Sequence, residues 1–150
     1  MEKKRLTKIL ARADRRDVAA MSAEILAICR PVIIKEPCKT LAMIKMREPV
    51  KQSLFYIGEV IVCEAVVEID GIRGFAVLMG DDEEKTLDMA IIDAACSKGI
   101  FTHMDKLLEL EKQQNDHVMR ENAMHLKTMV DFESLDQEAP EDLAANKKLT

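Results

Sequence analysis

The stretch FYIGEVIVCEAVVEIDGIRGFAVLMGDDEEKTLDMAIIDAA, residues 55–95, decides the fold of this chain. Asp70-Gly71 separates two apolar runs, and it is a strong β-hairpin signal because a type I′ turn needs positive φ at both central positions. A turn here predicts an antiparallel register in which opposite residues share a face. The predicted pairs are Ile69–Ile72, Val67–Gly74, Ala65–Ala76 and Cys63–Leu78 on one face, and Glu68–Arg73, Val66–Phe75 and Val62–Met79 on the other.

The residues after the hairpin predict a capped helix. Asp81 can act as the N-cap, and Glu84 follows at the spacing of a capping box. Lys98 and Gly99 suit the other end of the helix, where positive charge and a left-handed residue are favoured. Apolar residues recur at helical spacing, so we expect one side of this helix to pack on the hairpin. These residues are Leu87, Ala90, Ile91, Ala94 and Ala95.

Two helices are predicted ahead of the hairpin. Apolar residues recur at helical spacing in residues 2–13 and in residues 17–29, and Asp17 is the expected N-cap of the second helix. Pro31 ends that helix. Because the link between the two is short, the pair is an αα-hairpin.

The expected fold is α+β, with an antiparallel sheet of about four strands. Residues 32–35 and 40–47 predict two strands on either side of Glu36-Pro37-Cys38-Lys39, and the long central hairpin supplies two more. The strands follow one another instead of alternating with helices, which favours α+β over a parallel α/β fold. We expect residues 1–132 to form a single domain.

A long last helix is predicted after Thr102, and its middle, residues 112–117, has no apolar face. About 30 residues of helix would reach ~45 Å. Either the helix breaks near Asn115 or its second half projects to meet another chain, and we favour the second interpretation. Residues 133–150 form an acidic tail without a dense apolar pattern, which predicts a mobile terminus or a short docking segment.

Composition narrows the function classes. The net charge of −5 argues against a nucleic-acid-binding surface. MEKKRLTK is not followed by a secretory apolar region, and no apolar run approaches the ~20 residues that span a bilayer. We therefore expect a cytoplasmic protein with no membrane partner. The widely spaced cysteines show no CxxC pair, which argues against a disulfide framework or a zinc knuckle. They are Cys29, Cys38, Cys63 and Cys96.

No catalytic or metal-binding pattern emerges, and Glu59 is the residue most worth attention. Strict alternation places Glu59 on an apolar face with Phe55, Ile57, Ile61 and Cys63, and buried carboxylates cluster at functional sites. The alternative, which we favour, is a bulge at Gly58 that turns Glu59 outward. The histidines lack the i, i+4 spacing of a helical zinc site and are expected at the surface, and no phosphate-binding glycine motif is present. They are His103, His117 and His125.

The sequence resembles the PhnG family, the small accessory subunit of the bacterial carbon–phosphorus lyase system. The resemblance rests on FYIGEVIVCEAVV, on GFAVLMGDDEEKTLDMAIIDA and on Val130-Asp131-Phe132, with weaker similarity from Leu6 to Ala11. The order and spacing of these pieces match, so the resemblance covers residues 6–132. It singles out Gly58, Glu59, Asp131 and Phe132 as functional candidates. None of the four is assigned a catalytic, cofactor-binding or metal-binding role.

The resemblance implies a non-catalytic subunit of a complex in phosphonate catabolism. That complex transfers ribose triphosphate from ATP to methylphosphonate with release of adenine, giving ribose 1-methylphosphonate 5-triphosphate. The cleaving residues are expected on a larger partner, and no cofactor is expected on this chain although the complex uses ATP. The expected partners are the other core subunits, bound through the last helix and an exposed sheet surface. A homodimer of the isolated chain stays open.

Two other functions stay open. One is a stand-alone homo-oligomeric module that binds a small ligand in a closed apolar pocket between sheet and helices. The other is an enzyme built around Glu59, which would need a second titratable group nearby.

Overall fold

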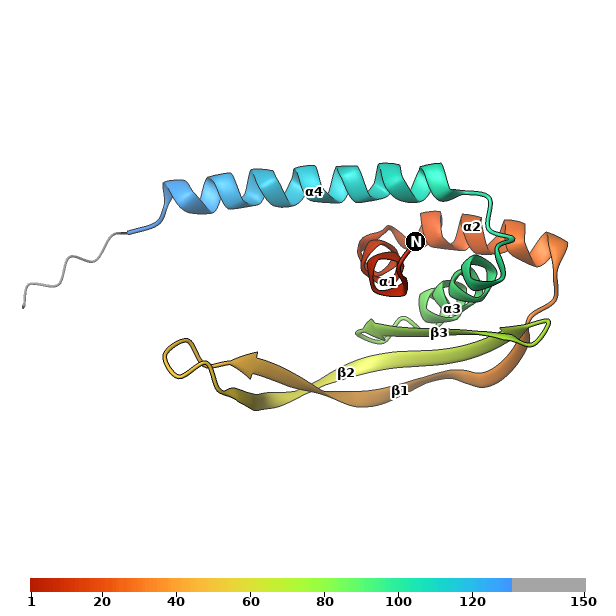
Figure 1. Cartoon of the computed structure of the whole chain (residues 1–150), viewed down its shortest axis with the longest axis horizontal. Helices are drawn as coiled ribbons and strands as arrows, with labels where there is room; N and C mark the ends of the chain where they lie inside the picture. Colours follow the sequence, from red (N-terminus) through yellow and green to blue (C-terminus); the bar gives the residue numbers. More distant parts are fainter. Residues whose placement is uncertain (131–150) are drawn as a thin grey trace, which may run out of the picture. The chain divides into compact units, whose positions relative to one another are not determined.

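The computed structural model describes residues 1–130 of the 150-residue chain. Across these residues it has four helices and three strands (Figure 1). The chain divides within its last helix into two compact units, residues 1–116 and the residues from 117 onward, and each is described by itself. The elements are α1 (Lys3–Arg12), α2 (Arg15–Ile28), β1 (Val32–Arg47), β2 (Leu54–Ile69), β3 (Ile72–Met79), α3 (Glu83–Lys98) and α4 (Met104–Lys127).

The three strands form one antiparallel sheet in the order β1-β2-β3. The turn between β2 and β3 has positive φ at Asp70 (47°) and Gly71 (81°), as a type I′ turn requires. All seven residue pairs predicted for this hairpin are confirmed. The turn chemistry therefore determined which face of each strand packs on the core.

The prediction of about four strands is wrong. Residues 32–35 and 40–47 belong to the single strand β1, which continues through Pro37. Proline is tolerated because β1 lies at the edge of the sheet, where an N–H group need not be donated to a neighbouring strand. The register of β1 against β2 also shifts on both sides of Lys35, so the strand accommodates the proline by irregular pairing.

The helical pair before the sheet is confirmed, but its predicted cap is wrong. The second helix begins earlier than expected, and the carboxylate of Asp14 accepts a hydrogen bond from the Arg16 N–H at 2.8 Å. Asp17 instead lies in the first turn, where it forms an ion pair with Lys106 at 3.3 Å. Either aspartate suits a helix start electrostatically, and the chain uses the earlier one.

Helix α3 packs on the sheet as predicted and is the most buried element. All seven residues from 89 to 95 are buried, because the sheet lies on one side of α3 while α1 and α2 contact its other sides. Asp81 was predicted to cap α3, but Asp82 does so and accepts from the Lys85 N–H at 3.0 Å. At the other end Gly99 adopts the predicted left-handed conformation, with φ of 81°.

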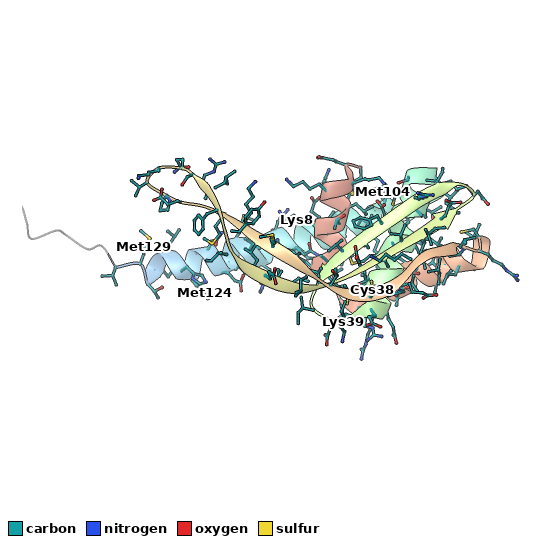
Figure 2. All side chains as sticks on the ribbon, turned by 90° about the horizontal axis from the view of Figure 1, so that it is seen from below. Lys8, Cys38, Lys39, Met104, Met124 and Met129 are labelled. Carbon is teal, nitrogen blue, oxygen red and sulfur yellow. The ribbon has the colours of Figure 1, made fainter. Side chains whose placement is uncertain are left out.

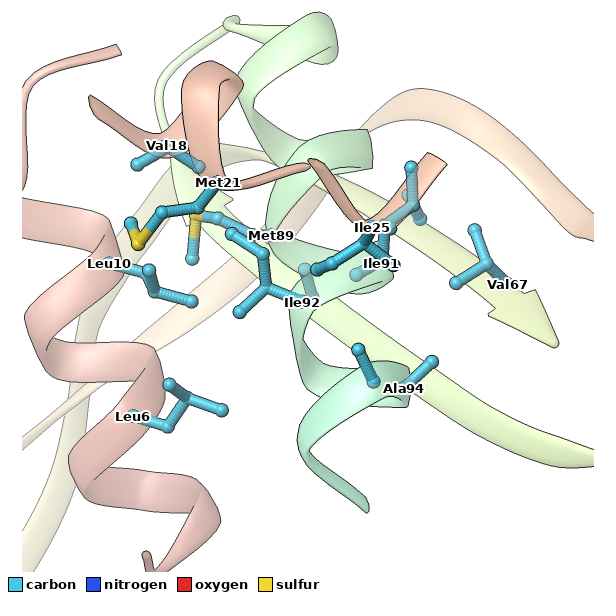
Figure 3. Packing of buried hydrophobic residues seen from close by; sticks show 14 of the residues in the cluster. Leu6, Leu10, Val18, Met21, Ile25, Val67, Met89, Ile91, Ile92 and Ala94 are labelled. Atoms are coloured by element: carbon cyan, nitrogen blue, oxygen red, sulfur yellow. The ribbon is translucent and has the colours of Figure 1, made fainter. Parts of the chain in front are cut away.

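The core lies where α3 meets the hairpin and the helical pair (Figure 3). Gly74 of β3 makes the closest approach. A Cβ atom at this position would lie 2.2 Å from the Ala90 carbonyl oxygen and 2.5 Å from the Ala94 nitrogen. Only glycine therefore lets the strand and the helix backbone come this close.

Two buried charged residues of α3 stabilise the contacts with its neighbours. Lys85 donates to the carbonyl oxygens of Ala11 (2.9 Å) and Ala13 (2.8 Å), at the negative end of α1. Burial lowers the pKa of Lys85. Asp93 accepts from the Phe75 N–H at 3.1 Å and from Lys3 at 3.2 Å. Each charge is buried with hydrogen-bonding partners, as buried charges must be.

Helix α4 is continuous from Met104 to Lys127, so a break near Asn115 is excluded. Within residues 1–116, Leu107 is buried, and the Gln114 side chain donates to the Ile9 carbonyl oxygen at 3.0 Å. In the following unit, His117 and Glu121 lie 3.4 Å apart, one helical turn from each other. Projection of this second half toward another chain stays a prediction.

Candidate interaction surface

The hairpin of β1 and β2 extends well beyond β3. Both long strands have 16 residues, whereas β3 has 8 and pairs only with residues 62–69 of β2. Residues 41–47 therefore pair with residues 54–61 in a ribbon of two strands, which projects past the end of β3 (Figure 1). We refer to residues 41–61, including the connecting loop, as the arm.

The pairing register gives the arm two different faces, because opposite residues of an antiparallel pair share a face. One face carries no charged residue and consists of the pairs Ala42–Val60, Ile44–Gly58 and Met46–Phe55. We call it the uncharged face. The other, the mixed face, consists of Leu41–Ile61, Met43–Glu59, Lys45–Tyr56 and Arg47–Leu54.

Large apolar side chains of the arm are exposed on both faces. Leu41 is 60% exposed and Tyr56 58%, and Figure 2 shows side chains standing out from both sides of the ribbon. An isolated two-stranded ribbon is at best marginally stable in water, and contiguous exposed apolar surface usually marks an interaction site. The exposed large apolar residues are Leu41, Met43, Ile44, Met46, Val50, Leu54, Phe55, Tyr56, Ile57 and Ile61.

The two candidates from the middle of β2 lie in the arm. The register skips Ile57 between Gly58 and Tyr56, so a bulge lies directly beside Gly58. Glu59 is exposed and lies opposite Met43, but no register shift separates it from Ile61 and Cys63, so it keeps their alternation and the bulge does not turn it outward. A Cβ atom at Gly58 would meet nothing within 4 Å. Gly58 and Glu59 are thus adjacent on opposite faces of the arm.

The other two candidates, Asp131 and Phe132, lie outside the described residues, as does the acidic tail predicted for residues 133–150. The structure therefore describes only the first two of the four candidate positions.

Hydrogen bonds organise the tip of the arm, the loop of residues 48–53 between β1 and β2. The Glu48 carboxylate accepts from the backbone N–H groups of Val50 (2.8 Å) and Lys51 (2.5 Å). Arg47 donates to the Gln52 carbonyl oxygen at 2.9 Å, and Gln52 has a positive φ of 56°. Val50 is left 84% exposed at the outermost part of the loop. This tip presents an apolar side chain instead of hiding it.

Alternation along β2 had predicted an apolar face running from Phe55 to Cys63. Cys63 is buried, but Glu59 and Ile61, which keep its alternation, are exposed, and the bulge at Ile57 places Phe55 on the opposite face. Strand β3 pairs only with residues 62–69 of β2, so it does not extend along the arm. The difference in length between the strands was visible in the sequence. It was the one signal that could have identified residues 54–61 as uncovered.

The cleft at the start of α3 is a poor candidate for an anion site. It has a volume of about 490 Å³, and four consecutive acids line it beside Arg15 and Lys39. The two cations already face carboxylates, since Arg15 pairs with Glu84 and Lys39 lies 3.8 Å from Asp81. Like-charged carboxylates would repel a phosphate group here.

Within residues 1–130, no three His, Cys, Asp or Glu side chains lie close enough together to hold a metal ion. His117 and His125 are exposed, whereas His103 is half-buried and lies 2.5 Å from Glu24. Across the same residues, no helix combines the length and the apolar character needed to cross a membrane.

A compact α+β base that carries an uncovered apolar arm is typical of proteins that present a surface to other polypeptides. The sequence matches the family described as phosphonate metabolism protein PhnG over residues 1–137, which is most of the chain. The chain belongs to the PhnG family, as the sequence resemblance indicated, and is thereby associated with phosphonate metabolism. No curated protein was found to match it.

Proposed function

We propose that this chain is a non-catalytic subunit of a carbon–phosphorus lyase core complex. In this role it is needed for the transfer of ribose triphosphate from ATP to methylphosphonate with release of adenine. The residues that perform the transfer lie on a larger partner, and ATP is bound by the complex outside this chain. Membership of the PhnG family supports the pathway, and the arm supports the role of an assembled subunit.

The exposure of the arm carries this proposal. Burying one large apolar side chain stabilises an assembly by about 1.5–3 kcal/mol, so residues 41–61 offer a partner considerable binding free energy. Phe55 and Met46 lie opposite each other on the uncharged face, without a charged neighbour on that face that would have to be desolvated. We expect a partner subunit to cover this face first.

The competing ligand-binding module requires a closed cavity between the sheet and the helices. Helix α3 occupies that space, and its side chains form one core cluster with those of α1, α2, β2 and β3. The competing enzyme requires a second titratable group near Glu59, and among residues 1–130 the exposed Glu59 side chain forms no hydrogen bond or ion pair. Within residues 1–130, neither alternative has a structural observation in its favour.

The proposal is tested by co-expressing the chain with the candidate large partner subunits of the same genome. An affinity pull-down measures assembly, and an assay with ATP and methylphosphonate measures adenine release. A complex that releases adenine only when this chain is present supports the proposal. A chain that purifies alone and leaves adenine release unchanged contradicts it.

A matched pair of phenylalanine variants tests the arm. Phe55 is 44% exposed on β2 within the arm, and Phe75 is 51% exposed on β3 outside it. Phe55→Asp places a carboxylate on the uncharged face, and we expect it to weaken assembly by about tenfold or more, the size of an interface hot spot. Phe75→Asp should leave assembly close to that of the parent. Equal losses in both variants would show that the arm is not the specific docking surface.

A further inference from the structure

The uncharged face of the arm continues by one row onto the rest of the sheet. Thr40, Val62 and Met79 lie side by side in that row, on β1, β2 and β3. Strand alternation places Met79 on the face opposite Gly74, which packs against α3. Helices α1, α2 and α3 lie on that other side of the sheet (Figure 1), and Met79 is 69% exposed. We call these four rows the open strip: Met46–Phe55, Ile44–Gly58, Ala42–Val60 and Thr40–Val62–Met79.

Every side chain of the open strip is uncharged, and charged residues mark both of its ends. Next to the row that contains Met79, the following row contains Glu64, which forms an ion pair with Lys35. Beyond Met46, at the other end, lies Glu48, whose carboxylate binds backbone N–H groups of the loop. Covering the open strip therefore removes apolar surface from water without desolvating a charge.

The large and small side chains of the open strip are arranged so that the strip complements a second copy of itself. In a two-fold dimer, the axis can lie across the strands between the second and third rows, so that two strips face each other with antiparallel strands. Strand β1 then lies over β1 of the second copy, and β2 over β2. Side chains of packed sheets interdigitate, so a large side chain needs a small one opposite.

The two central rows of the open strip meet this requirement. Ile44 lies over Ala42 of the second copy, so a branched side chain faces a single methyl group. Val60 lies over Gly58 of the second copy, where a Cβ atom would meet nothing within 4 Å. Because the axis is two-fold, each of these contacts occurs twice in the dimer.

The two outer rows match in the same way. Met46 lies over Thr40 of the second copy, and Phe55 lies over Val62, which is only 6% exposed and leaves room for the aromatic ring. Met46 and Phe55 are each 44% exposed in the single chain, so both have apolar surface to bury. A second copy of the chain therefore supplies the side-chain sizes that every row of the open strip requires.

We propose that the isolated chain forms a two-fold homodimer through the open strip. Four rows about 6.8 Å apart and two strands wide give a contact of roughly 300–400 Å² per copy, below the ~800 Å² of a standard interface. The dimer is therefore weak, with a Kd on the order of 10–100 µM. It covers the uncharged face while the chain is alone and gives way to a partner subunit. That exchange rests on the function proposed above, whereas the dimer itself requires no other subunit.

Sedimentation velocity of the purified full chain tests the dimer. The weight-average sedimentation coefficient is measured from about 2 µM to about 500 µM, a range that brackets the expected Kd. It should rise from the monomer value toward the dimer value with a midpoint at tens of micromolar. A chain that stays monomeric throughout overturns the proposal. A mass that grows beyond the dimer also overturns it, because a two-fold contact closes on itself.

Neighbouring residues on opposite faces of β1 provide a matched pair of variants. Ile44 belongs to the open strip, whereas Met43 lies on the mixed face opposite Glu59 and is 59% exposed. Ile44→Lys places a charge in the centre of the strip and should raise the Kd by about tenfold or more. Met43→Lys adds the same charge to the other face and should leave the Kd within about twofold of the parent. Equal effects would show that the dimer forms through another surface, which overturns the proposal.

An exchange of side-chain sizes tests the arrangement of the two copies. Ala42→Ile alone places two isoleucine side chains over each other, and it should raise the Kd by about tenfold because the contact is overfilled. Adding Ile44→Ala places one large side chain over one small one again, so the Kd should return to within about threefold of the parent. Circular dichroism shows whether each variant is folded. If the folded double variant dimerises no better than Ala42→Ile, the proposal is overturned.

Discussion

Replacement of Gly74 by alanine probes the packing of α3 on the sheet. The new Cβ atom would lie 2.2 Å from the Ala90 carbonyl oxygen and 2.5 Å from the Ala94 nitrogen. These two atoms belong to successive turns of the α3 backbone, at the i, i+4 spacing of a helical hydrogen bond, so no side-chain rotation relieves the overlap. To reach a separation of 3.0 Å, α3 would have to move by about 0.8 Å away from β3.

A displacement of that size removes a quarter to a half of the dispersion attraction along the contact. This loss of dispersion attraction acts together with backbone strain. We therefore expect Gly74→Ala to lower the free energy of unfolding by about 3 kcal/mol. For a chain of this length that corresponds to a fall in Tm of about 6–12 °C. Thermal and urea unfolding followed by circular dichroism measure both quantities.

Gly58→Ala is the matched control, because a Cβ atom at Gly58 meets nothing within 4 Å and its φ is not positive. It should leave stability unchanged or raise it by up to about 0.5–1 kcal/mol, since glycine within a strand is unfavourable. If both alanine variants have a Tm within about 1 °C of the parent chain, β3 and α3 do not approach each other as closely as described.

Two further predictions concern titratable groups of α3, the buried Lys85 and the half-buried Cys96. Burial lowers the pKa of Lys85 in the folded chain below its usual 10.5. Between that lowered pKa and pH 10.5, the unfolded chain therefore binds more protons than the folded chain. The free energy of unfolding should rise with pH across this window. Urea unfolding measures this free energy, and its rise with pH should be smaller for Lys85→Met than for the parent chain. An equal rise in both chains would contradict the desolvation of Lys85. Burial raises the pKa of the Cys96 thiol to about 11, which leaves about one thiolate in a thousand at pH 8. Iodoacetamide should therefore modify Cys96 slowly in the folded chain and quickly in urea, as mass spectrometry would measure, and equal rates in both states would refute its burial.

The part of the fold that sequence predicted best is governed by local chemistry. Asp70-Gly71 permits one tight turn, and that turn determines the register of every pair along β2 and β3. The predicted end of α3 at Gly99 is correct for the same kind of reason, because glycine adopts the left-handed conformation there without strain.

The errors arose where several residues satisfy the same local rule. Asp81 and Asp82 are both good N-caps, and tertiary contacts decide between them. Asp82 caps α3, whereas Asp81 faces Lys39 of β1. Residues 32–35 and 40–47 predict two strands on either side of Pro37, yet β1 is an edge strand, where proline is tolerated, and continues through it.

The buried charges of α3 illustrate a different limit of sequence reasoning. Asp93 and Lys85 lie on a helix whose pattern predicted a single apolar side. The helix is instead covered on several sides, so polar residues outside the apolar stripe are buried as well. Their partners include backbone atoms distant in sequence, the Phe75 N–H and the Ala13 carbonyl oxygen. No side-chain pattern in the sequence encodes such partners.

The arm shows how a candidate site can follow from what the rest of the chain leaves uncovered. Strand β3 ends at Met79, and Gly80, with φ of 105°, directs the chain into α3 instead of along β2. A ribbon meant only for solvent would carry polar residues on both faces, as natural sheets do at exposed edges. Ile44, Met46 and Phe55 occupy such positions without a charged neighbour on their face. The described part of this chain does not bury these side chains, so we infer that another polypeptide does. The variant Phe55→Asp tests that inference.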